Sequence, residues 1–442
     1  MCKINQCTFR FIQLLKIITL ATLLSGCQHF PTLFPEKSEP EPVPLVNKTS
    51  SITTHEFQRT EGQTLIGELA TLHSQENDSL PDIARHYGLG FNDIANANPQ
   101  LSPWVPTTDS KVVLPLRFIL PEVPHKDIVL NLANMRMFYF PKNQPDKVLT
   151  YPVGIGRDGW NTPMGVTQII SKTVNPTWNV PASIHQEHAQ KGDQLPTAVR
   201  AGPNNPLGKY AMRLALPSYL IHGTNKPYGI GMQVSHGCIQ LYPEDVEVLF
   251  NKVKIGTSVN IIHQPYLTAW HDDMLYLEAN QPLSKWATDK AQLQKQLTKK
   301  LKQISAKRDV LIDWEKVKQI LQRADSIPTP ILQNSPTLTQ IADSAIQLNH
   351  PEQFYQQPNV GEIRRNDWAL LVASFKNELE AQQLSAMLNH QGPIIPARKV
   401  QKANHYYVIA GPFKNKEEMQ AAAKRLKVDF ELKAKPLKPT ES

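Results

Sequence analysis

The sequence predicts a multidomain protein in which a mainly-β block lies between two small α+β modules. Its 442 residues exceed what a single hydrophobic core usually covers. Short runs rich in Val, Ile, Tyr and Phe, separated by Gly, Pro and Asn, fill residues 126–264 and predict strands. Strand-like and helix-like segments alternate over residues 364–436, which predicts a separate α+β domain.

The N-terminus has the pattern of an export signal. A basic start precedes an apolar run from Leu14 to Leu24, which is too short for a comfortable membrane span. The run ends in Leu-Ser-Gly-Cys27, which resembles the lipobox of bacterial lipoproteins. This resemblance implies that a signal peptide of residues 1–26 is removed and that Cys27 carries lipid. Because Gln28 follows instead of aspartate, it also implies an anchor in the outer membrane. An uncleaved N-terminal anchor is the alternative.

The cysteine count and the net charge limit the possible partners. After removal of the leader, only Cys27 and Cys238 remain, and a lipid-modified Cys27 leaves Cys238 without a disulfide partner. We therefore expect Cys238 to be a free thiol even in an oxidising compartment. The net charge of +8 is modest, and an exported chain rarely meets nucleic acid, so no nucleic-acid partner is expected. An anionic wall polymer, a lipid surface or simply solvated helix faces account for the charge.

Residues 27–62 are predicted to be a Pro-rich tether, because the composition of Pro31–Pro44 favours extended polyproline conformations and cannot build a core. Residues 63–118 then contain two short helices, at 79–88 and 91–98, and a strand at 111–115. This order resembles a LysM module, in which two helices pack on a small sheet and bind glycans. A purely structural cap on the next domain is the alternative, since such a helix pair is mostly core.

The central block, residues 126–264, is predicted to be a β-sandwich or barrel with one helix at 242–251. The strands are expected at 128–132, 135–140, 148–154, 165–172, 211–215, 219–222 and 259–263. Residues 270–360 are interpreted as a helical region, with helices at 285–307 and 314–324, followed by a linker.

The C-terminal block contains two near repeats, Val372-Ala-Ser-Phe-Lys-Asn and Ile409-Ala-Gly-Pro-Phe-Lys-Asn, which indicate a duplicated β-α-β unit. The expected order is strand 368–375, helix 377–391, strand 394–400, strand 406–413, helix 416–427 and strand 430–435. This βαββαβ, ferredoxin-like pattern resembles the SPOR domain over residues 364–436, which implies binding to glycan strands stripped of their peptides. A generic α+β interaction domain is the alternative, because this fold has many functions.

One cysteine and one histidine carry the predicted chemistry. Cys238 follows Ser235, His236 and Gly237, a setting that suits a reactive thiol better than a buried apolar residue, and His222 is near enough in sequence to activate it. For acyl transfer we expect Cys238 to attack a carbonyl and His222 to move the protons. The backbone N–H groups of residues 236–238 face the developing oxyanion in this hypothesis, and Ser235 and His236 shape the loop or contact substrate. A zinc site formed by the two histidines and Cys238, and an inert turn, are the alternatives.

Four sequence motifs around these residues resemble those of a known enzyme family. In order they are Asn161-Thr-Pro-Met-Gly165, Ala201-Gly-Pro-Asn-Asn-Pro-Leu-Gly208, Ile221-His-Gly-Thr224 and Ser235-His-Gly-Cys-Ile-Gln240. Together they resemble the YkuD-type catalytic domain of bacterial L,D-transpeptidases, a mainly-β sandwich with a Cys–His pair. The resemblance implies cleavage of the meso-diaminopimelate–D-alanine bond of a tetrapeptide stem and formation of a thioester on Cys238.

The resemblance also implies the partners. After the thioester has formed, an amine takes the acyl group from Cys238. The amine belongs either to the diaminopimelate of another stem, which gives a 3→3 cross-link, or to a lysine of a wall-anchored lipoprotein. Peptidoglycan is the expected partner, with no cofactor and no metal. Gly223, Thr224 and Gln240 are expected to contact substrate. The family usually has arginine or asparagine where this chain has Gln240, which puts a carboxylate-binding role of that position in doubt.

Two other functions fit the same residues. A hydrolase would release the thioester with water and trim or cut stems. A wall-binding scaffold would need neither Cys238 nor His222, and both are present.

Overall fold

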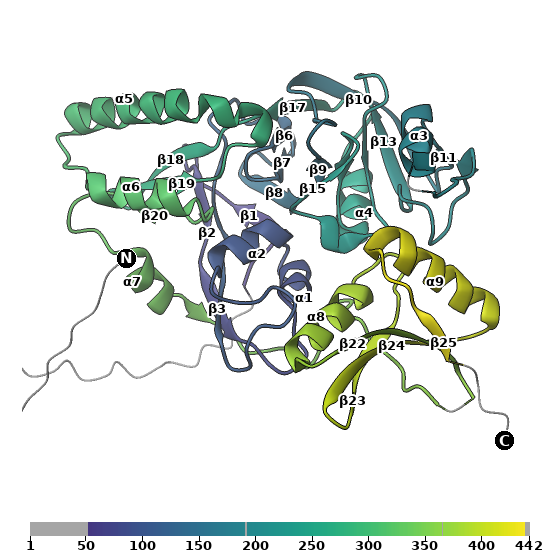
Figure 1. Cartoon of the computed structure of the whole chain (residues 1–442). Helices are drawn as coiled ribbons and strands as arrows, with labels where there is room; N and C mark the ends of the chain where they lie inside the picture. Colours follow the sequence, from purple (N-terminus) through teal and green to yellow (C-terminus); the bar gives the residue numbers. More distant parts are fainter. Residues whose placement is uncertain (1–51, 191, 365, 438–442) are drawn as a thin grey trace, which may run out of the picture. The chain divides into compact units, whose positions relative to one another are not determined.

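The computed structural model describes residues 52–190, 192–364 and 366–437 (Figure 1). The predicted signal peptide, Cys27 and most of the predicted tether lie outside the described residues. Within the described part, no helix combines the length and apolar character that a membrane crossing requires.

The central block is built on a nine-stranded mixed sheet. In spatial order its strands are β1 (Glu56–Gln58), β8 (Lys147–Pro152), β7 (Arg136–Phe140), β6 (Asp127–Asn131), β17 (Ser258–Ile262), β10 (Gly165–Val174), β13 (Tyr210–Leu214), β14 (Leu220–His222) and β16 (Ile239–Gln240). All seven predicted strands of the block are present, and the predicted helix is α4 (Pro243–Lys252). The pairs β17–β6 and β14–β16 are parallel, and the other pairs are antiparallel.

Strand β10 divides this sheet into two halves that enclose one core. Its first part pairs with β17 and its second part with β13, and the register shifts between Ile169 and Ser171. Such an irregularity bends a strand. Leu130 from one half and Met212 and Ile239 from the other are buried in the same cluster. The mainly-β architecture predicted for this block is therefore confirmed.

The N-terminal module has the predicted helix pair and is joined to the central block by a shared core. Its elements are β2 (Leu65–Gly67), β3 (Ala70–His73), α1 (Leu80–His86), α2 (Phe91–Ala97), β4 (Lys111–Leu114) and β5 (Arg117–Ile119). Leu72 and Ile83 of this module are buried in one cluster with Val129 and Phe138 of the large sheet. The module thus caps one side of the sheet, which is the structural alternative considered above. Sugar binding by a LysM-like module stays a prediction.

The range predicted as tether, residues 27–62, includes one strand of the large sheet. Residues 56–58 form β1, which pairs with β8 at the edge of the large sheet. The reason is Phe57, whose buried ring belongs to the core shared with the N-terminal module. The Pro-rich composition of the predicted tether gives no indication of this apolar anchor.

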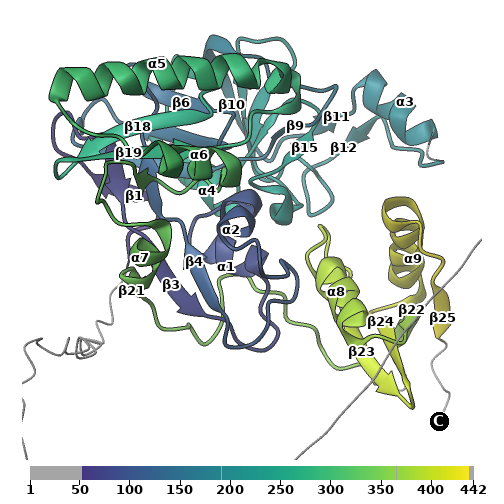
Figure 2. The same cartoon turned by 60° about the vertical axis from the view of Figure 1, so that its left-hand side comes forward.

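Residues 266–347 contain more sheet than predicted (Figure 2). The two predicted helices are present as α5 (Lys290–Arg308) and α6 (Trp314–Arg323), preceded by a 3₁₀ turn, η2 (Ser284–Asp289). They share a core with a three-stranded sheet of β18 (Tyr266–His271), β19 (Met274–Ala279) and β20 (Thr329–Pro330). The predicted linker contains α7 (Leu338–Asp343) and β21 (Ile346–Gln347), and β21 pairs with β3.

The C-terminal domain has the predicted βαββαβ order. Its elements are β22 (Trp368–Phe375), α8 (Glu378–Asn389), β23 (Ala397–Lys402), β24 (His405–Phe413), α9 (Lys416–Phe430) and β25 (Lys435–Leu437). The sheet order is β23-β24-β22-β25, and both helices contribute to one core against it. The last strand begins later than predicted, because α9 continues to Phe430 and Glu431 ends it in a left-handed conformation.

Candidate active site

The pairing of β14 with β16 brings the predicted histidine and cysteine to one face of the sheet. Ile221 lies opposite Ile239 and His222 opposite Gln240 in a parallel register. Both isoleucines are fully buried in the core. Because successive side chains of a strand point to opposite faces, His222 and Cys238 lie on the other face.

The His222 ring is buried and oriented by a backbone carbonyl. His222 is only 3% exposed, and its Nδ1 lies 2.6 Å from the carbonyl oxygen of Gly223. A carbonyl only accepts, so the proton is on Nδ1 and the lone pair on Nε2. Burial lowers the pKa of His222 to about 4, although the carbonyls of Gly223 and Leu207 act in the opposite direction. At neutral pH the ring is an uncharged base.

The Cys238 thiol is half-buried and protonated at rest. Its Sγ lies 3.7 Å from the carbonyl oxygen of Ser218. Burial raises the pKa of Cys238, while the backbone of Leu220 and the Arg213 guanidinium act to lower it. The resting pair is therefore a thiol and a neutral imidazole, and a thiolate forms only when a base takes the thiol proton.

Ser235 and Gly237 shape the turn that presents Cys238. The Ser235 hydroxyl donates to the Cys238 carbonyl at 2.6 Å and accepts from the Gly237 N–H at 3.1 Å. The Gly237 N–H is thus engaged within the loop. Of the three N–H groups expected to face the oxyanion, those of His236 and Cys238 remain. Gly237 has φ +103°, and a Cβ there would lie 2.8 Å from the Tyr219 ring. Only glycine fits this position.

Thr162 fixes the same turn from a distance in sequence. Its hydroxyl donates to the Gly237 carbonyl at 2.8 Å and accepts from the Gly156 N–H at 3.0 Å. Gly156 ends β9 (Ile155–Gly156), which pairs with β15 (Gln233–Ser235). Thr162 belongs to the Asn-Thr-Pro motif noted in the sequence, but no role was assigned to it there.

His236 is held by a charged pair that the sequence did not reveal. Arg157 Nη2 and Glu187 Oε2 lie 2.9 and 3.0 Å from Nε2 of His236, and Arg157 also donates to Glu187. Arginine only donates and a carboxylate only accepts, so Nε2 of His236 bonds to one of these two groups in either tautomer. The Trp160 ring packs edge-on against it at 4.8 Å between centroids. The His236 ring is therefore held in place by the Arg157–Glu187 pair and by Trp160.

Glu187 comes from an insertion between β10 and β13. The insertion contains β11 (Trp178–Asn179), α3 (Ala182–Gln190) and β12 (Ala198–Val199), with β11 paired to β12. The contact between Glu187 and His236 connects α3 to the loop that contains Cys238.

The three remaining predicted site residues contact the protein framework. The Gly223 carbonyl orients His222, as described above, and Thr224 is buried with its hydroxyl accepting from the Lys226 N–H at 2.9 Å. Gln240 is half-buried, and its backbone exchanges two hydrogen bonds with Gly154. Among the described residues, no group of three His, Cys, Asp or Glu side chains could hold a metal ion.

A cation that the sequence did not single out faces the pair. Arg213 of β13 lies opposite Leu220, and Leu220 directly precedes the residues of β14 that pair with β16. Arg213 is exposed and lies on the same sheet face as His222 and Cys238.

A thiol and a neutral, carbonyl-oriented imidazole on one face of a β-sandwich are the arrangement of a cysteine-dependent acyltransferase. The model of the L,D-transpeptidase catalytic domain matches residues 125–261, and the SPOR domain model matches residues 365–434. The probable L,D-transpeptidase YcfS of Escherichia coli strain K12 is 42% identical over 239 residues, covering 52% of this chain and 74% of that protein. The probable L,D-transpeptidase YbiS of the same strain is 37% identical over 272 residues, covering 59% and 87%.

A third relative, the probable L,D-transpeptidase ErfK/SrfK of Salmonella typhimurium strain LT2, is 36% identical over 286 residues, covering 63% of this chain and 91% of that protein. The chain belongs to the L,D-transpeptidase family, a family of cysteine-dependent acyltransferases, and it carries a SPOR domain. The two matched domains do not include residues 63–118.

Proposed function

We propose that this chain is an L,D-transpeptidase of the cell envelope that acts on peptidoglycan tetrapeptide stems through a thioester on Cys238. The observation that carries the proposal is the parallel pairing of β14 with β16, which sets the Cys238 thiol and the His222 base on one face. The neutral state of His222 suits it to take the thiol proton.

The first half-reaction is acylation of the enzyme. Sγ of Cys238 attacks the carbonyl of the meso-diaminopimelate–D-alanine bond while its proton passes to Nε2 of His222. The N–H groups of His236 and Cys238 stabilise the oxyanion, because that of Gly237 already donates to Ser235. Collapse of the tetrahedral intermediate breaks the amide bond, and the departing D-alanine amine takes the proton from His222.

The second half-reaction transfers the acyl group to an amine. His222 removes a proton from the attacking amine, and the Cys238 thiolate leaves and is reprotonated. The amine of diaminopimelate in another stem gives a 3→3 cross-link, and a lysine of a wall-anchored lipoprotein gives an attached lipoprotein. Arg213 supplies the charge that Gln240 lacks, and its place on the reacting face suits it to hold a substrate carboxylate.

The proposal includes a location. A lipid on Cys27 would hold the chain on the periplasmic face of the outer membrane, and the SPOR domain would bind glycan strands of the wall. Cys27 lies outside the described residues, and the resemblance of its surroundings to a lipobox supports this part.

The test is incubation of the purified protein with disaccharide-tetrapeptide, followed by mass analysis of protein and products. We expect a covalent adduct on the wild-type protein and a cross-linked dimer as product. The Cys238→Ala variant should form neither and should keep the wild-type unfolding midpoint, because one sulfur at a loop removes little packing. A tripeptide product would indicate the hydrolase, and unchanged substrate would indicate the scaffold.

A further inference from the structure

The long helix α5 carries charge of one sign only. Its 19 residues contain seven lysines or arginines and no aspartate or glutamate. Helix α9 of the SPOR domain is also rich in lysine, but it balances this charge with Glu417 and Glu418 in its first turn. The last-turn cations of α5, Lys307 and Arg308, are favoured by the helix dipole. The lysines in the middle of the helix have no such explanation.

One face of α5 is fixed against the protein. Leu297 and Leu301 are buried in the core that α5 shares with α6 and β19. Lys300 pairs with Glu122, and the Arg308 guanidinium lies over the Trp270 ring, 4.3 Å from its centroid. These contacts determine which side of the helix is turned away from the protein.

Three lysines form a stripe on that outer side. Lys295, Lys299 and Lys302 are all exposed and follow one another at i, i+4 and i+7. At about 100° per residue they fall within roughly 60° of the helix circumference, opposite the buried leucines. Within the described part of the chain, their side chains make no hydrogen bond or ion pair. Like charges at these spacings destabilise a helix, and no nearby anion offsets the repulsion.

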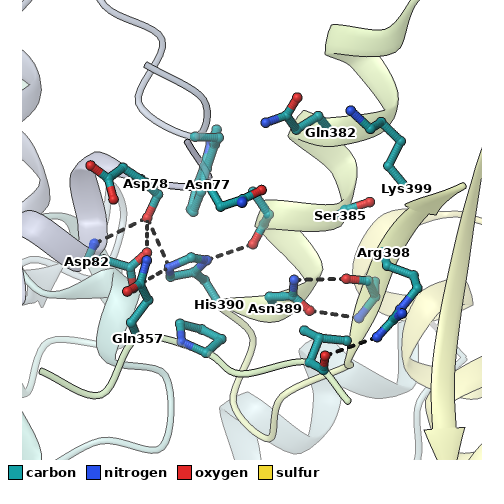
Figure 3. Close-up of a pocket in the computed structure, with 16 residues that line it drawn as sticks. Asn77, Asp78, Asp82, Gln357, Gln382, Ser385, Asn389, His390, Arg398 and Lys399 are labelled. Atoms are coloured by element: carbon teal, nitrogen blue, oxygen red, sulfur yellow. Dashed lines mark hydrogen bonds and ion pairs between the residues drawn. The ribbon is translucent and has the colours of Figure 1, made fainter. Parts of the chain in front are cut away.

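Cations around the cavity lined by Asp82 and His390 are engaged, in contrast to this stripe (Figure 3). Nε2 of His390 lies 2.9 Å from the Asp82 carboxylate, and Lys399 pairs with Glu378. The Arg398 guanidinium donates to two backbone carbonyls of the connecting segment. An anionic partner would find these groups occupied, whereas the lysine stripe of α5 is available to it.

The turn after α5 adds two exposed apolar side chains. Leu311 is 68% exposed and Trp314 is 42% exposed. Ile312 is buried in the core beneath α5, and successive side chains of an extended segment point in opposite directions. The Leu311 carbonyl accepts from the Gln333 N–H at 2.9 Å, which holds this segment in place. Tryptophan and leucine next to basic residues are typical of segments that bind the interface of a lipid bilayer.

We propose that α5 and the turn after it form a docking surface for a bilayer of anionic phospholipid. This inference rests on the envelope location in the proposed function. The lysine stripe lies along the headgroups, and Leu311 and Trp314 enter the interface. An anionic wall polymer would also attract the lysines, but it offers no apolar phase for Leu311 and Trp314. The apolar pair therefore favours lipid.

The docking surface would act together with the proposed lipid on Cys27. Two membrane contacts on one chain raise the effective concentration of each other, so that neither has to be tight. The sheet of β18 and β19 packs on α5 and, through Tyr276, on Leu65 of the N-terminal module. A bilayer bound to α5 would therefore also orient the block that carries Cys238.

The experiment is vesicle sedimentation with residues 28–442, which include every residue that the structure describes and lack Cys27. The probe is vesicles of phosphatidylcholine with about 30% phosphatidylglycerol, and vesicles of phosphatidylcholine alone are the reference. We expect binding to the anionic vesicles only. This binding should weaken at least about tenfold between about 0.05 M and about 0.5 M salt, because salt screens the lysines.

Two variants test the two parts of the surface. The triple variant Lys295→Gln, Lys299→Gln, Lys302→Gln should bind the anionic vesicles about 10- to 100-fold more weakly, the scale of three cations at an anionic surface. Glutamine is a good helix former, so α5 should stay folded. The double variant Leu311→Gln, Trp314→Gln should bind about three- to tenfold more weakly, and this difference should persist at high salt.

A control with the same change in net charge is available in the SPOR domain. Lys414, Lys416 and Lys427 are exposed and lie outside α5. Their triple replacement by glutamine should leave vesicle binding at the wild-type level. An equal loss in this control and in the α5 variant would indicate general attraction of a basic protein and would overturn the docking surface.

Vesicle binding that is unchanged in either α5-region variant would also contradict the proposal. If the lysine variant lost retention on isolated wall sacculi but not on vesicles, the stripe would belong to an anionic polymer instead. Adduct formation at Cys238 should stay at the wild-type level in all of these variants. Failure of the docking surface is therefore distinguishable from failure of the proposed transpeptidase.

Discussion

The two histidines near Cys238 differ in what their ring nitrogens contact. The His222 ring is oriented by backbone carbonyls, with Nδ1 donating to Gly223, whereas Nε2 of His236 is held by the charged side chains of Arg157 and Glu187. A general base needs an unengaged lone pair within reach of the proton. This difference agrees with the proposed roles of His222 as the base and of His236 as a fixed part of the loop.

The first prediction concerns the pH dependence of acylation. The rate should rise as pH passes the His222 pKa of about 4, because only the neutral ring accepts the thiol proton. It should then stay level from about pH 5 to about pH 8, since the raised Cys238 pKa keeps the thiol protonated and the base is fully deprotonated. Measurement of kcat/KM for adduct formation across this range tests it. An acidic limb centred near the ordinary histidine pKa would contradict it.

The second prediction is that Gly237→Ala abolishes acylation, by at least about 10²-fold, because the loop must move to relieve the clash with Tyr219. Positive φ alone costs of order 1–3 kcal/mol for a non-glycine residue. Gly256→Ala is the control, since φ there is +88° and no atom lies within 4 Å of an added Cβ. Both variants should lose stability in thermal unfolding, but only Gly237→Ala should lose activity. Equal activity of the two would refute the steric argument.

At the residue scale, the sequence motif predicts the Cys238–His222 pair but not the residues that contact its loop. Cys238 and His222 stand out because their neighbours are unusual for buried residues. The Thr162–Gly237 and Glu187–His236 contacts join residues 75 and 49 positions apart, and nothing in either local pattern indicates the partner. The Gly223 carbonyl is a backbone atom that a search for functional side chains does not consider.

Among the elements, α3 is the one that most directly affects the reacting loop. It was absent from the predicted elements because only one of its residues, Ile184, is buried, so it has no apolar stripe. Its place is set by Glu187 instead. The hairpin β18–β19 was not predicted for a different reason. Helix-like patterns begin soon after Trp270, and residues from 270 onwards were therefore interpreted as helical.

The third prediction tests α3. Glu187→Gln should raise KM for the stem substrate roughly three- to tenfold with little change in kcat. The charged bond is worth about 1.5–3 kcal/mol at most, and partial exposure of both partners reduces this. Gln186→Ala, an exposed change on the same helix, is the control and should behave like the wild type. A fall in kcat with unchanged KM would show that Glu187 acts on the chemistry and not on the position of α3.

At the scale of the whole molecule, shared cores decide which predicted segments are separate domains. The order of blocks could be read from composition and periodicity, and the βαββαβ repeat identified the SPOR domain. The core common to the N-terminal module and the large sheet could not be predicted, because it joins Ile83 to Phe138 and similar pairs far apart in sequence. Residues 346–347 of the predicted linker likewise form a strand because they pair with the edge of β3.

The fourth prediction concerns the contact between the SPOR domain and the N-terminal module. His390 faces Asp82, Ser79 and Trp104, with Arg85 as a nearby opposing charge, and the Asp82 carboxylate raises its pKa despite burial. A raised pKa means that the contact is strongest below the ordinary histidine pKa and weakens as pH rises through the raised value. The protection factors of amides in α1 and α8, which are corrected for the intrinsic rise of exchange with pH, should therefore be lower at high pH than at about pH 6. His390→Gln should remove this dependence, and a pH dependence that survives in that variant would contradict the assignment.

Strand β1 also has a mechanical consequence. It enters the fold at the outer edge of the sheet that carries the reacting pair, held by three residue pairs with β8 and by the Phe57 ring. Any pulling force transmitted along the preceding segment would be borne by this strand before it reached another element. Because Phe57 is packed against both the sheet and the N-terminal module, the load would be shared between them and would not open the sheet near β14 and β16, which lie at its opposite edge.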